Sequence, residues 1–332
     1  MAATLPPAAA AAAPAAQHQH PHHNDHEQHQ QLQADAFKRL YPEQFFARFA
    51  AEGVRPDGRG LSTPRPVTIG LGAVGAADGS ALVKVGPTAV LAGCRLEVAV
   101  PPDDAPGVGQ VVVSAELSAL ASGAWRPGRA APEAHELAAR VSQLLTGPSG
   151  VLDARQLCIS PGAAVWVLYL DLYVLDAAGG LLDAALLAAA AALRDCRLPS
   201  VHLTDEGNVE RGPDPEASAD GGAGGGGGGG GGDSTALRLA AAPVCLTCGV
   251  YKGAVVVDPD HEEEALMGAR VSVVVDGEGG LLGVFKPGGS ALVAPQTLLT
   301  CVALAQARQR EVQAQLEAAL RQQREQQRPE GG

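Results

Sequence analysis

The chain has 332 residues, and its 24 Lys and Arg against 36 Asp and Glu give a formal net charge of −12. This acidic balance excludes a protein that coats nucleic acid with its whole surface, although it allows a local basic patch. Hydrophobic residues make up 46% of the sequence, which suits a folded protein, but 42 Gly and 24 Pro indicate long segments outside the folded body.

Six Cys residues are scattered along the chain without the spacing of a disulfide framework, and no apolar secretory segment follows Met1. The longest uncharged apolar stretch of the folded body, Ala184–Leu193, is ten residues long and too short to span a bilayer. We therefore expect a soluble protein of a reducing compartment that does not interact with membranes.

Two stretches are predicted to be disordered, because neither can bury enough apolar surface to offset its ordering entropy. Residues 1–34 consist mainly of Ala, Pro, Gln and His, with six of the nine His between His18 and His29. Residues 204–235 include acidic residues near their start and a run at 221–232 of eleven Gly interrupted only by Ala223. Clustered imidazoles are able to bind a metal ion, but the tail offers no Cys and no fixed geometry, so we predict no functional metal site there.

The predicted organisation has five parts. They are a disordered tail at 1–34, an N-terminal helix with the first subdomain at 35–203, the Gly-rich insert at 204–235, a second subdomain at 236–310, and a C-terminal helix and tail at 311–332.

The residues before the insert predict helices and a group of strands. The apolar spacing in Phe37–Phe49 is roughly helical, and Pro42 suits the start of a helix better than its middle. Strands are expected at 81–85, 88–98, 111–117 and 165–175, and helices at 132–145 and 181–193. The hairpin signal Gly86-Pro87 joins the first two strands, and Gly179-Gly180 forms a turn before the last helix.

The residues after the insert predict a second block of strands followed by a long helix. Strands are expected at 244–250, 254–258, 269–276 and 281–286. A helix is expected from Pro295 to about residue 328, with its distal half projecting into solvent because it is rich in Gln, Arg and Glu. The fold class that follows is α+β, with two blocks that each consist of a sheet backed by helices.

Cys245 and Cys248 have the spacing of half a zinc site or of a redox pair, but no second pair lies at ligand spacing. On a strand, residues three apart point to opposite faces, so the two thiols cannot bind one ion. We therefore predict that both are packing residues.

Five carboxylates lie within the seven residues from Asp258 to Glu264, at the end of a predicted strand. Such a cluster can hold Mg²⁺ or supply a general acid, and it also suits a helix N-terminus, where acids complement the dipole. Arg126 and Arg129 lie in a predicted loop beside Trp125, which is compatible with phosphate binding and base stacking or with ordinary surface arginines. No dinucleotide fingerprint, P-loop or Ser nucleophile elbow accompanies these residues.

Several motifs in the same order resemble the RNase PH family. They are Arg55-Pro-Asp-Gly-Arg59, 77–86, 157–162 followed by Val165-Trp-Val-Leu-Tyr, Leu175-Asp176 with 182–189, 257–264 and 285–290. Within the family they are most similar to the ring subunits of the eukaryotic RNA exosome, and among these to the class called component 8. The resemblance covers about residues 37–315, except for the 204–235 insert.

The resemblance implies the RNase PH fold, with a first subdomain similar to ribosomal protein S5 domain 2 and an RNase PH C-terminal subdomain. It also implies a six-membered ring of related subunits around an RNA channel, with S1/KH cap subunits and associated hydrolytic exoribonucleases. The nucleus, nucleolus and cytoplasm are the implied locations.

Active relatives use phosphate to cleave the 3′-terminal linkage of RNA, which requires cations for the phosphate and carboxylates for Mg²⁺ and proton transfer. The resemblance places the phosphate-binding turn at Ala131-Pro132-Glu133, where Glu133 and Glu136 would repel phosphate. We therefore expect no phosphorolytic activity.

The predicted function is that of a non-catalytic ring subunit that supports 3′-to-5′ RNA processing and decay, including rRNA maturation and mRNA turnover. No cofactor and no metal are predicted, and three carboxylates are expected as remnants without a catalytic role. These are Asp258, Asp260 and Glu264. The candidate RNA-binding residues are Arg126, Arg129, Arg55 and Arg59. The alternatives are an active phosphorolytic exoribonuclease and an RNA-binding adaptor that works outside any ring.

Overall fold

The computed structural model describes residues 32–123, 125–126, 131–147, 150–204, 209–212, 234–240 and 242–326. Almost all of the predicted disordered tail and the whole Gly run lie outside the described residues, as does Arg129. The chain divides into two compact units, Met1–Glu52 and Gly53–Gly332, and each is described by itself.

The first unit contains two consecutive helical segments, over residues 32–40 and at α2 (Pro42–Ala51). The helix breaks at Tyr41 because Pro42 has no N–H to continue it, and Pro42 begins α2 as its position in the sequence predicts. Aromatic rings bridge the break, with centroids 6.3 Å apart for Phe37 and Phe45 and 5.0 Å apart for Phe45 and Phe49. The predicted helix around Pro42 is therefore confirmed, with an interruption.

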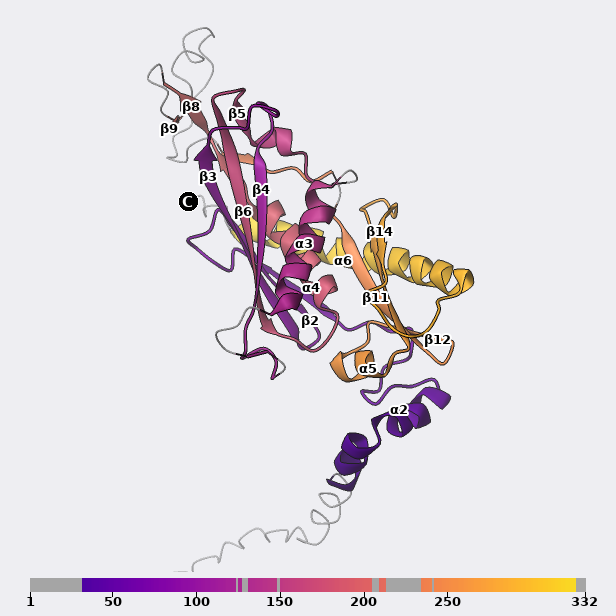
Figure 1. The fold of residues 1–332 in the computed structure, drawn as a ribbon. Helices are drawn as coiled ribbons and strands as arrows, with labels where there is room; N and C mark the ends of the chain where they lie inside the picture. The colour runs from indigo at the N-terminus through magenta and orange to yellow at the C-terminus, as the bar shows by residue number, and fades with distance from the viewer. Residues whose placement is uncertain are drawn as a thin grey trace, which may run out of the picture. The chain divides into compact units, whose positions relative to one another are not determined.

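The second unit begins with a six-stranded sheet (Figure 1). Its strands are β1 (Val67–Leu71), β2 (Gly79–Val85), β3 (Thr88–Ala99), β4 (Gln110–Leu117), β5 (Cys158–Ser160) and β6 (Ala164–Asp176). The order is β1-β2-β3-β6-β4, with β5 paired to β6. β4 and β6 are parallel, so the chain has to cross over between them, and helix α3 (Pro132–Thr146) lies in that crossover.

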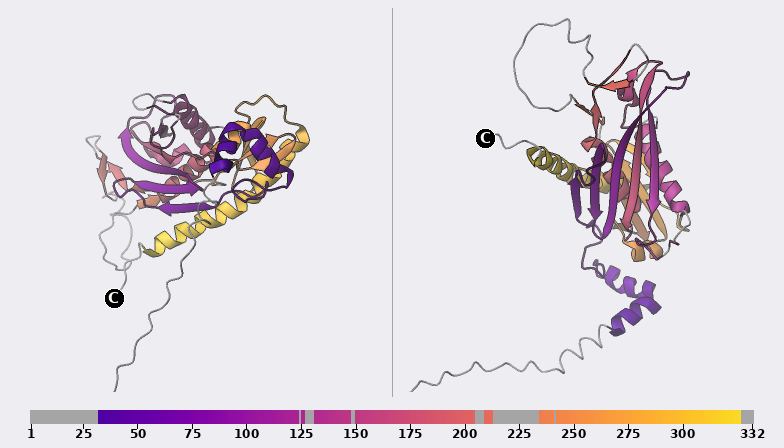
Figure 2. Two further views of the ribbon diagram at one scale, coloured as in Figure 1. Left: turned by 90° about the horizontal axis from the view of Figure 1, so that it is seen from below. Right: turned by 90° about the vertical axis from the view of Figure 1, so that its left-hand side faces the viewer.

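A second sheet of four strands follows the insert, in the order β12-β11-β13-β14. Its strands are β11 (Val244–Tyr251), β12 (Ala254–Val257), β13 (Ala269–Val275) and β14 (Leu281–Phe285), and the short helix α5 (His261–Leu266) connects β12 to β13. α3 packs on β4, while α4 (Leu181–Asp195) packs on β2, β3 and β11. The two helices thus lie between the two sheets, which explains why α4 is apolar on nearly every side (Figures 1 and 2).

The insert is bordered by short pairs of strands. β7 (Arg197–Pro199) pairs with β10 (Ser234–Ala236), and β8 (Val201–Leu203) pairs with β9 (Val209–Arg211). Because β7 and β10 lie on either side of the Gly run and are hydrogen-bonded, the chain leaves and re-enters the second unit at neighbouring points. Extra length at such a place costs little closure entropy.

The long helix α6 (Pro295–Gln326) packs on both halves of the second unit. Cys301 and Ala305 pack against the second sheet, whereas Val312, Leu316 and Leu320 join the core formed by the first sheet and α4. The expectation that the distal half projects into solvent is therefore wrong as far as Leu320. Some of its polar residues also contact the body of the unit, since Arg308 and Gln309 are buried and Gln323 donates to Asp195.

Cys245 and Cys248 lie on β11 and point to opposite faces of the second sheet, as their spacing predicts. Cys245 packs in the core around α4, and Cys248 packs in the core with Cys301 of α6. Within the described ranges, none of the helices combines the length and apolar character needed to cross a membrane.

Candidate functional site

The Gly179-Gly180 turn positions the start of α4. Both glycines have positive φ angles, of 89° and 62°, which L-residues with a side chain rarely adopt. A Cβ on Gly179 would lie 2.7 Å from main-chain atoms of Asp260 and His261, and one on Gly180 would lie 2.6 Å from the Arg65 guanidinium. The two glycines therefore let the β6–α4 connection approach the segment after β12 closely.

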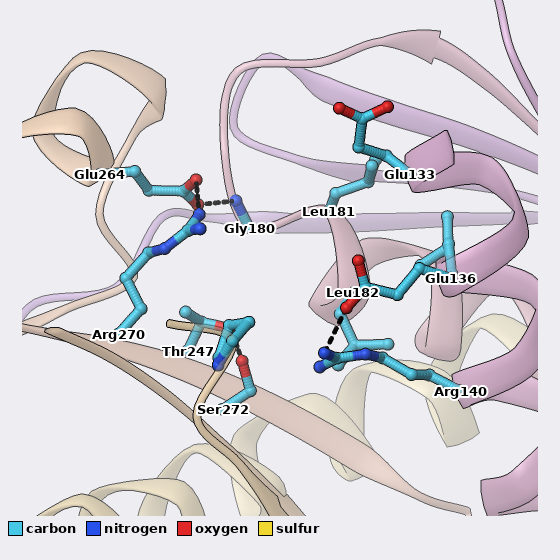
Figure 3. A pocket seen from close by; sticks show the side chains of 12 residues that line it. Glu133, Glu136, Arg140, Gly180, Leu181, Leu182, Thr247, Glu264, Arg270 and Ser272 are labelled. Atoms are coloured by element: carbon cyan, nitrogen blue, oxygen red, sulfur yellow. Dashed lines mark hydrogen bonds and ion pairs between the residues drawn. The ribbon is translucent and has the colours of Figure 1, made fainter. Parts of the chain in front are cut away.

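A cavity of about 150 Å³ lies at this point, where α3 and α4 both begin (Figure 3). Its lining comes from both halves of the second unit. The lining residues are Glu133, Glu136, Leu137 and Arg140 of α3, Gly180, Leu181 and Leu182, Thr247, Glu264, Arg270, Ser272 and Pro287. The lining carries three carboxylates against two guanidinium groups, so the cavity favours cations over anions.

Both arginines of the cavity are already paired with carboxylates. Arg140 Nη2 donates to Glu136 Oε1 one helical turn earlier, and Arg270 Nη1 donates to Glu264 Oε2 at 2.8 Å. The other oxygen of Glu264, Oε1, accepts the main-chain N–H of Gly180 at 2.8 Å (Figure 3). Among the described residues Glu133 has no ion-pair or hydrogen-bond partner at its side chain, and it is exposed.

Asp258, the first carboxylate of the cluster, is buried in an ion pair with Arg65. Its Oδ1 accepts Arg65 Nη2 at 2.6 Å, and its Oδ2 accepts both Nε at 3.0 Å and the main-chain N–H of Arg65 at 2.7 Å. Burial by itself would raise the pKa of Asp258, but the hydrogen bonds and charge of Arg65 outweigh it and hold that pKa below its usual value. Asp258 also has a φ of 50°, a left-handed conformation that Asp tolerates better than most residues.

Arg55, a candidate for RNA contact, is fully buried. Its Nη2 donates to the carbonyls of Leu61 and Val257, and its Nη1 donates to the carbonyl of Asp258 and to Glu263 Oε2. The guanidinium therefore ties the loop after α2 to the end of β12. No RNA phosphate can reach it without local opening of this loop.

Arg59 lies beside the same network, with 14% of its side chain exposed. Its Nε pairs with Asp57 at 2.5 Å, and its Nη1 and Nη2 lie 3.9 Å from carboxylate oxygens of Asp258 and Glu263. Three acidic partners surround this guanidinium, so its charge is largely compensated within the chain.

Asp260 caps helix α5. Its Oδ1 accepts the N–H of Glu263 at 2.8 Å, while Glu263 Oε2 accepts the N–H of Asp260 at 3.0 Å, which makes a capping box. Of the two interpretations of the acidic cluster, the structure therefore shows the helix N-terminus. Within the described part of the chain, no group of three or more His, Cys, Asp or Glu side chains is arranged to hold a metal ion.

Asp183 is a buried carboxylate that the sequence analysis named only as part of a motif. Its two oxygens accept the N–H and the hydroxyl of Thr247, each at 2.7 Å, and so join α4 to β11. Burial, with a smaller contribution from the charge of Asp258, raises its pKa to about 6.

The structure brings only some of the predicted site residues together. Glu133, Glu136 and Glu264 line one cavity, Asp258 and Arg55 lie in the buried network, and Arg126 is exposed in the loop before α3. Arg65 and Arg270 were not predicted as site residues, and Gly180 was predicted only as part of a turn. The Gly-Gly pair between a buried strand and a helix was a readable signal, because it marks a close approach at a helix start.

Two sheets with helices between them, joined by a buried ionic network and sharing one cavity, define a two-subdomain α+β protein. Residues 63–199 match the domain described as "3′ exoribonuclease family, domain 1" and residues 241–308 match "3′ exoribonuclease family, domain 2". Together the matches cover more than half of the chain. The chain belongs to the RNase PH family.

Relatives agree with this assignment. The chain is 36% identical over 241 residues to "Exosome complex component Rrp42" of Aeropyrum pernix, covering 73% of this chain and 81% of the relative. It is also 36% identical over 242 residues, with the same coverage, to the Rrp42 component of Saccharolobus solfataricus. The narrower resemblance to component 8 stays a prediction.

Solved structures resemble the fold. A chain of the Archaeoglobus fulgidus exosome with RNA bound to the active site superposes with a TM-score of 0.68 and 26% identity, covering 85% of this chain and 98% of that one. Rice Rrp46 superposes with a TM-score of 0.57 and 19% identity, covering 80% of this chain and 100% of that one, and shows the fold alone.

Proposed function

We propose that the chain is a non-catalytic ring subunit of an RNA exosome, in which it supports the ring and shapes the RNA channel. The observation that carries the proposal is 36% identity to archaeal exosome components over 73% of the chain. Other RNase PH-like ring subunits are the first partners that follow. The same proposal includes cap subunits and hydrolytic exoribonucleases as further partners. It also includes a location in the nucleus, nucleolus and cytoplasm.

The charges of the cavity support the absence of catalysis. Phosphorolysis needs cationic groups that are free to bind phosphate, and here Arg140 and Arg270 are each paired with a carboxylate. Glu133 and Glu136 at the start of α3 add negative charge where the resemblance to active relatives implies a phosphate-binding turn. Asp258 is bound by Arg65 through three hydrogen bonds and is buried away from the cavity lining.

In this proposal, the arginines that precede α3 contact RNA. Arg126 is exposed in the loop before α3, and Arg129 follows it outside the described residues. Arg55 is left out because every contact of its guanidinium is inside the chain, and Arg59 contributes little because acidic partners compensate its charge. A net charge of −12 with a small basic loop fits a subunit that touches mainly proteins and shows RNA a limited surface.

A phosphorolysis assay tests the proposal against the alternative of an active enzyme. The purified full chain, alone and with an RNase PH-like ring neighbour, is incubated with 3′-hydroxyl RNA and inorganic phosphate beside an active family member as control. We expect no nucleoside diphosphate from the chain alone. With the neighbour present, we expect no activity that depends on the cavity carboxylates of this chain, so release that stops on Glu264→Ala while the two chains stay associated would overturn the proposal.

A further inference from the structure

Three exposed arginines gather beside the strand pair β7–β10, and none of them lines the cavity described above. They are Arg155, Arg197 and Arg238, and they are called the arginine cluster below. Among the described residues, none of these three side chains has an ion-pair or hydrogen-bond partner. Arg140 and Arg270 of the cavity, by contrast, are each paired with a carboxylate. The donors of the arginine cluster are therefore open to a partner outside the chain.

The strand pair places Arg197 and Arg238 on one surface. Arg197 of β7 lies opposite Ala236 of β10, and both are exposed, whereas Leu198 and Leu237 beside them are buried. Successive side chains of an extended chain point to opposite faces, so Arg238, two residues after Ala236, points outward as Ala236 does. One step across the pair and two residues along it place the Cα atoms of Arg197 and Arg238 roughly 8 Å apart.

Gln156 fixes the third arginine at the same place. Gln156 Nε2 donates to the carbonyl of Arg238 at 2.8 Å, and Gln156 Oε1 accepts the N–H of Arg238 at 3.0 Å. Arg155 comes directly before Gln156 in a short 3-10 turn, Ala154–Leu157, and the last residue of this turn is fully buried. The turn is thus held against the main chain of Arg238, so Arg155 and Arg238 are neighbours.

The carboxylates near the arginine cluster are engaged elsewhere. Asp78, Asp153 and Asp195 each accept a main-chain N–H, at 2.8, 3.0 and 2.9 Å respectively. Within the described ranges, none of them forms an ion pair with an arginine of the cluster. These carboxylates lower the net charge of the surface, but they leave the N–H groups of three guanidinium forks unused.

The chemistry of this surface favours phosphate over a protein partner. A guanidinium binds two oxygens of one phosphate through parallel N–H groups, and it is always charged. The centre of a protein interface needs apolar or aromatic side chains, and here the exposed side chain between the arginines is Ala236, while Leu198 and Leu237 are buried. Contacts to a phosphodiester backbone need charge alone and are independent of sequence.

We propose that the arginine cluster binds the phosphodiester backbone of single-stranded RNA, at a surface separate from the cavity and from the loop of Arg126. The inference deepens the proposed function and rests on it in one respect, that the chain belongs to an assembly that acts on RNA. It adds a second contact surface, formed by the two ends of the chain that border the Gly-rich insert and by the turn at Arg155.

RNA binding by the full chain, with the acidic residues of the insert present, tests the inference. A short fluorescent single-stranded RNA is titrated at several NaCl concentrations, and binding is followed by anisotropy. The variant that combines Arg155→Gln, Arg197→Gln and Arg238→Gln should raise Kd at least about tenfold at low salt. The slope of log K against log salt should become shallower by about 2, because three phosphate contacts are lost.

A matched control removes the same charge from three exposed arginines outside the cluster. It combines Arg39→Gln, Arg310→Gln and Arg321→Gln. We expect it to change Kd less than about twofold and to keep the slope of wild type. Equal weakening by both triple variants would show a general charge effect and overturn the inference. So would wild-type chain that binds no RNA at low salt, or a cluster variant that binds RNA as wild type does.

Replacing the three arginines of the cluster by Lys keeps their charge and should keep the salt slope. A slope lost in this Lys variant would come from damage to the fold and would contradict a direct phosphate contact. A fluorescent polyglutamate peptide, titrated in parallel, should bind more weakly than RNA. If the Gln variant loses affinity for the peptide and not for RNA, the partner is an acidic protein segment and the inference is wrong.

Failure of this inference and failure of the proposed function are distinguishable. Unchanged RNA binding in the cluster variant would end the inference and leave the ring proposal standing. A chain purified without RNase PH-like partners would end the ring proposal, whatever the RNA titrations show.

Discussion

Two arginine–carboxylate pairs lie at the two ends of the segment 258–264, and they differ in burial and in surroundings. In the first, Arg65 and Asp258 have side chains that are 5% and 2% exposed, and three hydrogen bonds join them. In the second, Arg270 and Glu264 are 39% and 15% exposed and border a cavity. Pairs of the same chemistry thus form a buried anchor in one place and part of a cavity lining in the other.

Burial explains the difference. Breaking a buried pair leaves an uncompensated charge that has lost its hydration, whereas a charge at the surface recovers water when its partner is removed. The Arg65–Asp258 pair also spans 193 residues of sequence and joins the end of β12 to the loop before β1, so it is one of the contacts that link the two halves.

The largest effect is expected at the anchor. Asp258→Ala should lower the free energy of unfolding by about 3–5 kcal/mol, because Arg65 would remain buried without its counter-ion. Urea unfolding followed by circular dichroism measures the change. Asp260→Ala serves as the control, since loss of the α5 cap should cost only about 1 kcal/mol. Similar decreases in the free energy of unfolding in Asp258→Ala and Asp260→Ala would show that the buried ion pair stabilises the chain no more than a helix cap does.

The next effect concerns how the contribution of Asp183 to the free energy of unfolding depends on pH. The folded-state pKa of Asp183, about 6, lies above the ordinary value of 3.8, so the folded state binds more protons between these values. The stability that Asp183 contributes should therefore fall as pH rises from about 4 to about 6, by at most about 1.4 kcal/mol per pH unit. Asp258 has the opposite sign, because its lowered pKa makes its contribution fall as pH decreases below about 4.

Asp183→Asn isolates this contribution, because the amide does not titrate. The difference in unfolding free energy between wild type and Asp183→Asn should shrink or change sign as pH rises through this window. Urea unfolding curves at closely spaced pH values measure it. A difference that is constant from pH 4 to pH 7 would show that the carboxyl does not titrate there.

A smaller effect is expected at the cavity pair. Glu264→Ala should change the free energy of unfolding by less than about 1 kcal/mol, because Arg270 is partly exposed and becomes solvated. Thermal and urea unfolding beside Asp258→Ala give the comparison directly. A loss as large as that of Asp258→Ala would mean that both pairs are anchors.

The smallest effect on stability is expected at Arg126. Arg126→Ala should leave the free energy of unfolding within about 0.5 kcal/mol, because the side chain is exposed in a loop. In an assembled complex it should reduce crosslinking of RNA to this subunit and weaken the dependence of that crosslinking on salt. Arg95→Ala, at another exposed arginine, is the control and should leave crosslinking unchanged.

Much of the fold was predictable because its signals are local. Pro132 and Pro295 begin α3 and α6 where a missing N–H is tolerated, and Gly179-Gly180 forms the turn before α4. The faces of Cys245 and Cys248 follow from the two-residue period of a strand.

The features that were not predictable depend on contacts between distant residues. Nothing in the neighbourhood of Asp258 says that Arg65 is its partner, and nothing near Arg55 says that its guanidinium is buried against the Val257 carbonyl at the end of β12. The distal half of α6 looks solvated by composition, yet Leu316 and Leu320 pack against the first sheet and α4. Single apolar residues in a polar helix show their burial only when the surface opposite them is known.

Purification of the tagged full-length chain from its own cells, followed by sizing and mass spectrometry, tests the central claim most directly. The account predicts a large complex that contains other RNase PH-like subunits in amounts comparable to this chain. A monomer, or a complex bound to RNA without any RNase PH-like partner, would contradict the ring-subunit proposal and favour an RNA-binding adaptor.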